Sequence, residues 1–212
     1  MDAFVHNLAA ARIGATFNQY CEGGAADRDP ATAAAVRRAN LRAYLRAHAQ
    51  APVVAVAEAA GWRGARYSGI PLLSERLIDD AAGPYRRTST APGGFAEASA
   101  SIVQEVLRAG GWVDAVLLWN VVPTHPAGST PHSNRALRSA EVVAGQEFLL
   151  LLLDLVRPRH LVAIGRTAAA ALPPGLGAVE VRHPAHGGAT QCRTALKSLL
   201  CAWLGPRVAE VA

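Results

Sequence analysis

The sequence has few cysteines and no long apolar run, and each shortage excludes a class of protein. Its three cysteines, Cys21, Cys192 and Cys201, are odd in number and lack C-x-x-C spacing. This argues against a disulfide framework and against a four-cysteine metal or iron–sulfur site. Apolar stretches such as 148–153 are far shorter than the roughly 18 to 20 residues that span a bilayer. The first six residues lack the pattern of a secretory signal, so we expect a soluble, cytoplasmic protein.

Positive charge exceeds negative charge, and arginine supplies nearly all of it. Lys and Arg number 21 against 16 Asp and Glu, which leaves a formal net charge of +5, and Lys197 is the only lysine. The guanidinium group matches phosphate oxygens and keeps its charge on partial burial. This balance suits a polyanionic partner such as nucleic acid, although a GC-rich genome would also enrich arginine.

Four short apolar runs alternate with helical patterns, which is typical of a doubly wound α/β sheet. The expected strands are 52–57, 115–119, 160–164 and 178–181. Helical patterns are expected at about 72–80, 97–109, 139–156, 166–172 and 190–203. Asp29-Pro30 has the carboxylate and the proline of a helix start. The sequence therefore predicts one three-layer α/β domain over 1–212, with a central, mostly parallel four-stranded sheet between helices.

Polar residues gather directly after these strands, where a parallel sheet forms its binding sites. Ala57-Glu58-Ala59-Ala60-Gly61 spans the end of the first expected strand, and Tyr67-Ser68-Gly69 follows it. Asn120-Val121-Val122 follows the second strand, and His183-Pro184-Ala185 follows the fourth. We therefore expect these four segments to meet at one edge of the sheet.

With these motifs in this order, the chain resembles the uracil-DNA glycosylase superfamily. The first segment is similar to the G-E-A-P-G water loop of the family-four enzymes, and the Tyr67 segment falls where the family places an aromatic residue that stacks on the flipped base. The Asn120 segment resembles the strand-end asparagine that recognises the uracil edge. The His183 segment resembles the H-P-S motif, whose histidine faces uracil O2.

The departures from the family pattern define a divergent member, similar to the family-four and family-five branches. Ala57 replaces the first motif glycine and Ala60 replaces the proline. Ala59 is apolar where some branches carry a water-holding Asp or Asn, so Glu58 is the only carboxylate of this loop. The cluster-binding cysteines of the family-four enzymes are absent, so the resemblance implies no iron–sulfur cluster and no cofactor.

The resemblance also implies a role for each matched residue. Glu58 is expected to position the attacking water and to stabilise the positive charge that develops on the sugar. His183, as neutral imidazole, is expected to donate a hydrogen bond to uracil O2. The Asn120 amide offers one acceptor and one donor for uracil N3–H and O4, and Tyr67 offers a ring face for stacking. Gly61 and Ala59 are expected to complete the base pocket.

The implied partner is uracil-containing DNA, contacted by basic and glycine-rich positions around the strand ends. The expected contacts are Arg63, Arg66, Arg166, His186, Gly187 and Gly188. The implied reaction is hydrolysis of the N-glycosidic bond of uracil, which leaves an abasic site. We expect a monomer that works in the cytoplasm on the nucleoid.

Two alternatives remain open on the sequence alone. A non-catalytic nucleic-acid-binding domain would use the same basic surface, and Ala59 favours it because that position carries no catalytic group. A zinc-dependent hydrolase would draw on His125, His132, His183 and His186, although the His183–His186 spacing fits tetrahedral zinc poorly. Each motif residue also has an ordinary structural interpretation, such as an ion pair of Glu58 with Arg63.

Overall fold

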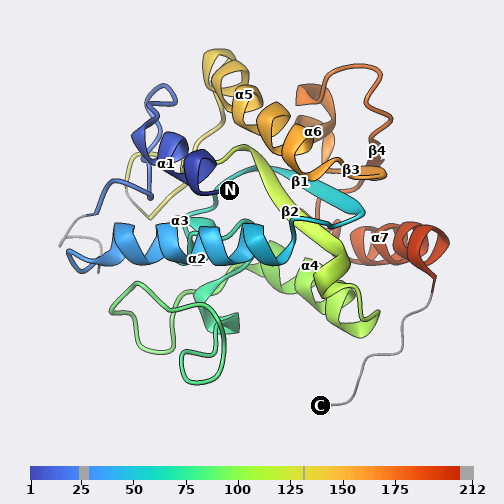
Figure 1. Ribbon diagram of the computed structural model, residues 1–212. Helices are drawn as coiled ribbons and strands as arrows, with labels where there is room; N and C mark the ends of the chain where they lie inside the picture. Colours follow the sequence, from blue (N-terminus) through green and yellow to red (C-terminus); the bar gives the residue numbers. More distant parts are fainter. Residues whose placement is uncertain (24–28, 131, 206–212) are drawn as a thin grey trace.

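A sheet of four parallel strands forms the centre of the computed structural model, which describes residues 1–23, 29–130 and 132–205 (Figure 1). The strands are β1 (Val53–Ala59), β2 (Val116–Val122), β3 (His160–Ile164) and β4 (Val179–Val181). Their order in the sheet is β2-β1-β3-β4, and every pairing is parallel. All four predicted runs form strands, because strands at the centre of a parallel sheet are covered on both faces and must be apolar. β1 and β2 extend further than predicted, so Glu58 and Asn120 lie within the last residues of strands and not after them.

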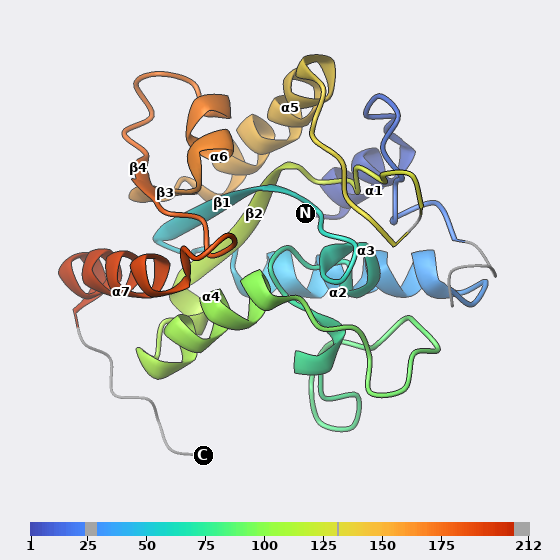
Figure 2. The ribbon, with the colours of Figure 1, turned by 180° about the vertical axis from the view of Figure 1, so that it is seen from behind.

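Helices cover both faces of this sheet. They are α1 (Asp2–Ala10), α2 (Ala33–Ala47), α3 (Ala65–Ser68), α4 (Ala98–Ala109), α5 (Ser139–Val156), α6 (Arg166–Ala171) and α7 (Ala189–Leu204), with the 3₁₀ turns η2 (Glu75–Leu77) and η3 (Val113–Ala115). Figures 1 and 2 show α5 and α6 on one side of the sheet and α2, α4 and α7 on the other. The predicted three-layer α/β architecture is therefore confirmed. No helix of the described residues is both long enough and apolar enough to cross a membrane.

The N-terminal helix α1, which the sequence pattern did not predict, packs into the core through one aromatic side chain. The ring centroid of Phe4 lies 5.6 Å from that of Trp119 on β2 and 6.0 Å from that of Phe148 on α5. Trp119 is completely buried. This aromatic group joins α1 to the sheet and to α5.

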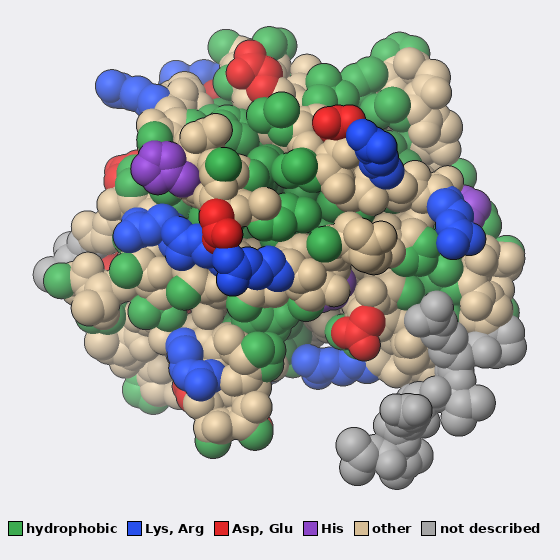
Figure 3. Space-filling view, in the orientation of Figure 1, with side chains coloured by type: hydrophobic (Ala, Val, Ile, Leu, Met, Phe, Trp, Pro, Cys, Tyr) green, Lys and Arg blue, Asp and Glu red, His purple; other side chains and the backbone are tan. Residues whose placement is uncertain are grey.

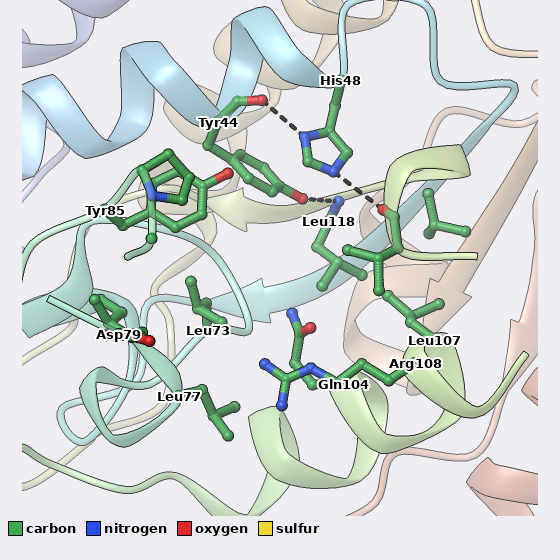
Figure 4. A pocket seen from close by; sticks show the side chains of 15 residues that line it. Tyr44, His48, Leu73, Leu77, Asp79, Tyr85, Gln104, Leu107, Arg108 and Leu118 are labelled. Carbon is green, nitrogen blue, oxygen red and sulfur yellow. Dashed lines mark hydrogen bonds between the residues drawn. The ribbon is translucent and has the colours of Figure 1, made fainter. Parts of the chain in front are cut away.

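At the edge of the sheet, β2 is completed by side chains from α2. The backbone N–H of Leu118 donates to the Tyr44 hydroxyl at 2.6 Å, and the His48 ring lies within hydrogen-bond distance of two backbone carbonyls, those of Tyr44 and Val113 (Figure 4). A mainly apolar cavity of about 210 Å³ adjoins these residues. It lies near the start of β2, away from the carboxyl ends of the strands.

The helix predicted at 72–80 is wrong, because the segment contains only the short turn η2. The Glu75 side chain is buried, and its carboxylate accepts backbone N–H bonds from Thr88, Ser89 and Phe95 at 2.7, 2.9 and 3.3 Å. These contacts wrap the chain around one carboxylate. Distant hydrogen bonds therefore override the local helical pattern.

The helix expected to run from Asp29-Pro30 through Val36 and Leu45 is present as α2, but the start and the cap predicted for it are wrong. Helix α2 begins at Ala33, and the Asp29 side chain is buried in ion pairs with Arg37 and Arg66. The carboxylate thus neutralises two buried guanidinium groups and caps no helix.

Gly145 is a point of close approach between α5 and β2. Replacing it by alanine should therefore destabilise the protein, although the same change usually stabilises a helix. A Cβ atom at this position would lie 2.4 Å from the carbonyl oxygen of Val121. An exposed Gly→Ala change within a helix stabilises by about 1 kcal/mol. Gly145→Ala should instead destabilise by about 1–3 kcal/mol, because the new methyl group forces α5 away from the sheet.

Urea unfolding followed by circular dichroism measures this difference. Glu147→Ala, on the exposed side of the same helix, is the control and should change the free energy of unfolding by less than about 0.5 kcal/mol. A stabilised Gly145→Ala protein would show that α5 is free to shift.

Candidate active site

Two adjoining pockets open where β1 and β3 end. The chain leaves β1 toward α3 and α4, and it leaves β3 toward α6 on the opposite face, which is the arrangement that opens a crevice in an α/β sheet. The main pocket, of about 270 Å³, is lined by residues 57–61, Leu72, Glu97, Ser99, Pro126, Asn134, Arg135, His183, Ala185 and His186. The side pocket, of about 240 Å³, is lined by Glu58, residues 164–167, Arg182, His183, Ala185 and His186.

The structure brings Glu58 and His183 together, since both side chains line both pockets. Glu58 comes from the end of β1, and His183 comes from the loop between β4 and α7. Figure 2 shows this loop beside the start of α4. Ala59 and Gly61, also expected in the site, line the main pocket.

Two hydrogen bonds hold the loop that follows β1. The His125 ring nitrogen Nδ1 lies 2.9 Å from the carbonyl oxygen of Ala60, and the backbone N–H of Trp62 donates to the Asn134 side chain at 3.0 Å. Both partners belong to the segment after β2. The loop that follows Glu58 is therefore held by the segment that follows the neighbouring strand β2.

The hydrogen bonding of His183 determines which ring nitrogen carries the proton. The backbone N–H of Ala185 donates to Nδ1 at 3.1 Å, so Nδ1 is an acceptor and the proton of the neutral ring sits on Nε2. Burial, followed by the nearby His186 and Arg182, lowers the pKa of His183. Near neutral pH the ring is thus a neutral Nε2–H donor.

Gly165 leaves room for this histidine. Its φ of +94° is a backbone conformation that favours glycine, and a Cβ atom there would lie 2.9 Å from the Cβ of His183. Gly188 approaches from the other side, where a Cβ atom would lie 2.1 Å from the His183 carbonyl oxygen. The two glycines let the chain close around His183.

Asn120 lies one strand away from the pocket wall. It pairs with Ala57 across the β1–β2 register, so the two side chains share a face of the sheet, and Ala57 lines the main pocket. Asn120 is 1% exposed, and no described residue is a hydrogen-bond partner of its amide. The amide is therefore buried beside the pocket with its hydrogen-bonding capacity unused.

Glu97 is a pocket residue that the sequence reasoning missed. It precedes α4 but makes no capping hydrogen bond to that helix. Its carboxylate lies instead against the β1 loop, where a Cβ atom on Gly61 would come within 2.2 Å of Oε1 and one on Gly64 within 2.0 Å of Oε2. Burial raises the pKa of Glu97 to about 7. In the sequence Glu97 is simply an acidic residue at the start of a predicted helix, so no sequence signal marks it as a pocket residue.

Tyr67 does not offer a free ring face, so the expected stacking role is wrong for this structure. Its side chain is completely buried, the Phe95 ring stacks on it at a centroid distance of 4.1 Å, and the Arg66 guanidinium lies over it at 4.4 Å. The apolar wall of the main pocket is Leu72, whose φ of +51° turns the chain at this point. The only sequence signal for Leu72 is a short apolar stretch after Gly69.

The expected phosphate contacts divide into exposed and buried residues. Arg166, His186 and Arg182, the last of which the sequence reasoning missed, are exposed and line the side pocket. Arg63 and Gly187 are exposed close in sequence to pocket-lining residues. Arg66 is 1% exposed and pairs with Asp29, and Gly188 is buried against His183. A buried group cannot reach a DNA backbone, so the expectation is corrected for Arg66 and Gly188.

The histidines of the zinc alternative do not form a ligand set. His125 is buried against Ala60, and only His183 and His186 of the four line the pockets. Among the residues that the structure describes, no three His, Cys, Asp or Glu side chains are grouped so as to hold a metal ion. The zinc alternative therefore lacks geometric support.

The raised pKa of Glu97 predicts a pH-dependent cost in stability. An unfolded chain releases this proton near pH 4.5, whereas the folded chain retains it to about pH 7. Stability should therefore fall as the pH rises from about 4.5 to 7, and the full cost should remain above pH 7. Glu97→Gln removes that cost, so it should raise the melting temperature at pH 8 and change it little at pH 4.

Thermal unfolding at both pH values, with Glu147→Gln at an exposed position of α5 as the control, measures the effect. An equal shift at pH 4 and pH 8 would contradict a desolvated carboxyl group at position 97.

Comparison with known proteins identifies the family. The family model described as the uracil DNA glycosylase superfamily matches residues 46–203. No curated protein matches the sequence. Among solved structures, wild-type SMUG2 from Pedobacter heparinus is similar, with a TM-score of 0.63 and 13% identity over 95% of this chain and 97% of that chain. At this identity the structural likeness shows the fold alone. The family model covers well over half of the chain and all four strands, and the protein therefore belongs to the uracil-DNA glycosylase superfamily.

Proposed function

We propose that this protein excises uracil from DNA by hydrolysing its N-glycosidic bond. Membership of the superfamily supports a DNA glycosylase at the coarse level. One observation carries the finer proposal: Glu58 and a neutral His183 that donates through Nε2 line the same pockets. Loss of a base from a nucleotide needs these two kinds of group, a carboxylate for the sugar and a donor for the base.

His183 would assist the departure of uracil. As the C1′–N1 bond breaks, its electron pair stays on the base, and negative charge develops on O2. A preorganised N–H donor stabilises such charge most strongly in a site that excludes water. The fixed Nε2–H of His183 needs no rearrangement at that moment.

Glu58 would stabilise the other half of the broken bond. The sugar develops positive charge at C1′, and an ionised carboxylate lowers the energy of that cation. Water then bonds to C1′, and the products are a free base and an abasic site. No step of this scheme calls for a cofactor.

Asn120 would recognise the base. Its amide presents a carbonyl acceptor for N3–H and an N–H donor for O4, whereas cytosine presents the reverse pattern. The unused hydrogen-bonding capacity of this buried amide supports the assignment. Leu72, in place of Tyr67, would provide the apolar contact to a base that has been flipped out of the stack.

DNA would be held at the rim of the pockets by Arg63, Arg166, Arg182, His186 and Gly187. Their exposure and mainly positive charge support phosphate contacts. Figure 3 shows further positive charge over α2 on the face of Figure 1, where Arg42 and Arg46 pair with Asp2. We propose that the protein acts as a monomer on DNA at the nucleoid, in the cytoplasm.

A non-catalytic binding domain is the second candidate, because Ala59 places a methyl group where some relatives carry a catalytic side chain. Such a domain would bind uracil-containing DNA and release no base. Excision assays separate the two candidates directly.

The test of function is base release from a uracil-containing oligonucleotide, followed as strand scission after alkali treatment. Wild-type protein should release uracil in the presence of excess chelator. His183→Ala should lower the single-turnover rate by about 10²–10³-fold while DNA binding is retained, because its contact strengthens mainly in the transition state.

His6→Ala, an exposed histidine on α1, is the control and should retain the wild-type rate. Binding without release by the wild-type protein would favour the non-catalytic domain. A rate that chelator abolishes and zinc restores would point to metal chemistry.

Asn120→Asp tests recognition of the base. The substitution replaces an N–H donor by a carboxylate oxygen opposite uracil O4, so uracil release should fall, by up to about 10⁴-fold if no other group recognises O4. Release of cytosine should become measurable, because its exocyclic amine meets an acceptor. Uracil and cytosine release are compared in folded protein; unchanged uracil release would remove Asn120 from the site.

A further inference from the structure

The segment at the end of β1 has a single carboxylate that could orient or deprotonate a water molecule. Ala59 and Ala60 are apolar, and Glu58 is the only carboxylate of the loop. Glu58 lines both pockets, and Arg166 and Arg182 line the side pocket with it. The main pocket nevertheless has a second carboxylate, which comes from a different part of the chain.

That carboxylate belongs to Glu97, at the start of α4. The backbone of Glu97 is extended, with φ −108° and ψ 125°, and the side chain turns from the helix toward the β1 loop. Both of its oxygens lie against glycine backbone, one at Gly61 and one at Gly64. A side chain at either position would push the carboxylate out of its present place.

The carboxylate is held there without a partner. Within the residues that the structure describes, neither a hydrogen bond nor an ion pair stabilises it. Arg135, which lines the same pocket, is engaged with Glu141 at 2.6 Å. A half-buried acid without a partner is unfavourable for the fold, and such groups concentrate at functional sites.

We propose that Glu97 is the base that activates the attacking water, in the role that Ala59 cannot fill. This inference rests on the proposed function. The water oxygen bonds to C1′, and the C1′–N1 electron pair leaves with the base. One water proton passes to the Glu97 carboxylate. The departing base, hydrogen-bonded at O2 by His183, takes a proton from solvent at N1, so atoms and charge balance.

The charged and titratable groups that face Glu97 in the main pocket are Glu58 from β1, Arg135 from the segment after β2, and His183 and His186 from the loop before α7. Burial raises the pKa of Glu97 to about 7. A base acts in its ionised form, so the excision rate should rise with pH through about 7 and then level.

The experiment compares single-turnover release of uracil between pH 5.5 and 9 for the wild type and four variants, one of which is Glu58→Gln. Glu97→Gln should lower the plateau rate by about 10²-fold and abolish the rise near pH 7, with binding of uracil-DNA retained. Glu147→Gln, at an exposed position of α5, should match the wild type. Added formate should partly restore the rate of Glu97→Ala, because it returns a carboxylate to the pocket.

The outcomes separate this inference from the proposed function. A wild type that releases no uracil at any pH overturns both. An active wild type with unchanged Glu97→Gln overturns the role of Glu97 alone. The same holds if Glu97→Gln is slower but keeps the wild-type pH profile, since that marks a structural effect. If Glu58→Gln and not Glu97→Gln removes the rise near pH 7, the base is Glu58.

Discussion

The ion pairs of the buried Asp29 carboxylate are the interaction on which the position of the chain after β1 depends. It pairs with Arg37 of α2 and Arg66 of α3, and all three side chains are buried. Arg37 also donates to the backbone carbonyl of Tyr67 at 3.2 Å, which ties α2 to the turn after the β1 loop. Buried charges persist only when they are paired, so this group fixes where the chain turns after Gly61.

The sequence predicts the sheet and the meeting of Glu58 with His183, because strands buried on both faces are recognisable and their carboxyl ends share one edge. The features that the sequence does not predict depend on contacts between residues that are far apart in the chain. The pattern at 72–80 looks helical, yet the Glu75 carboxylate binds backbone groups that follow much later in the chain. The sequence predicts functional roles for Tyr67 and Arg66. In the structure Phe95 stacks on the Tyr67 ring, and Arg66 is buried in an ion pair with Asp29.

Two titratable side chains of the main pocket, His183 and Glu97, have pKa values shifted by burial. Burial lowers the pKa of His183 and raises that of Glu97, so one physical cause moves both groups toward their neutral forms. A neutral histidine donates to a carbonyl without the hydration cost of a full charge. Such an interior suits a neutral base that becomes anionic only as it departs, while positive charge remains outside on the exposed arginines.

The close approach of Glu97 to Gly61 and Gly64 links three positions that are far apart in the sequence. A side chain at either glycine would occupy the space of a carboxylate oxygen. A larger residue at 61 or 64 would therefore displace the Glu97 carboxylate, which can move because it is the end of a flexible side chain. The size of the residues at 61 and 64 thus sets the position of the carboxylate in the main pocket.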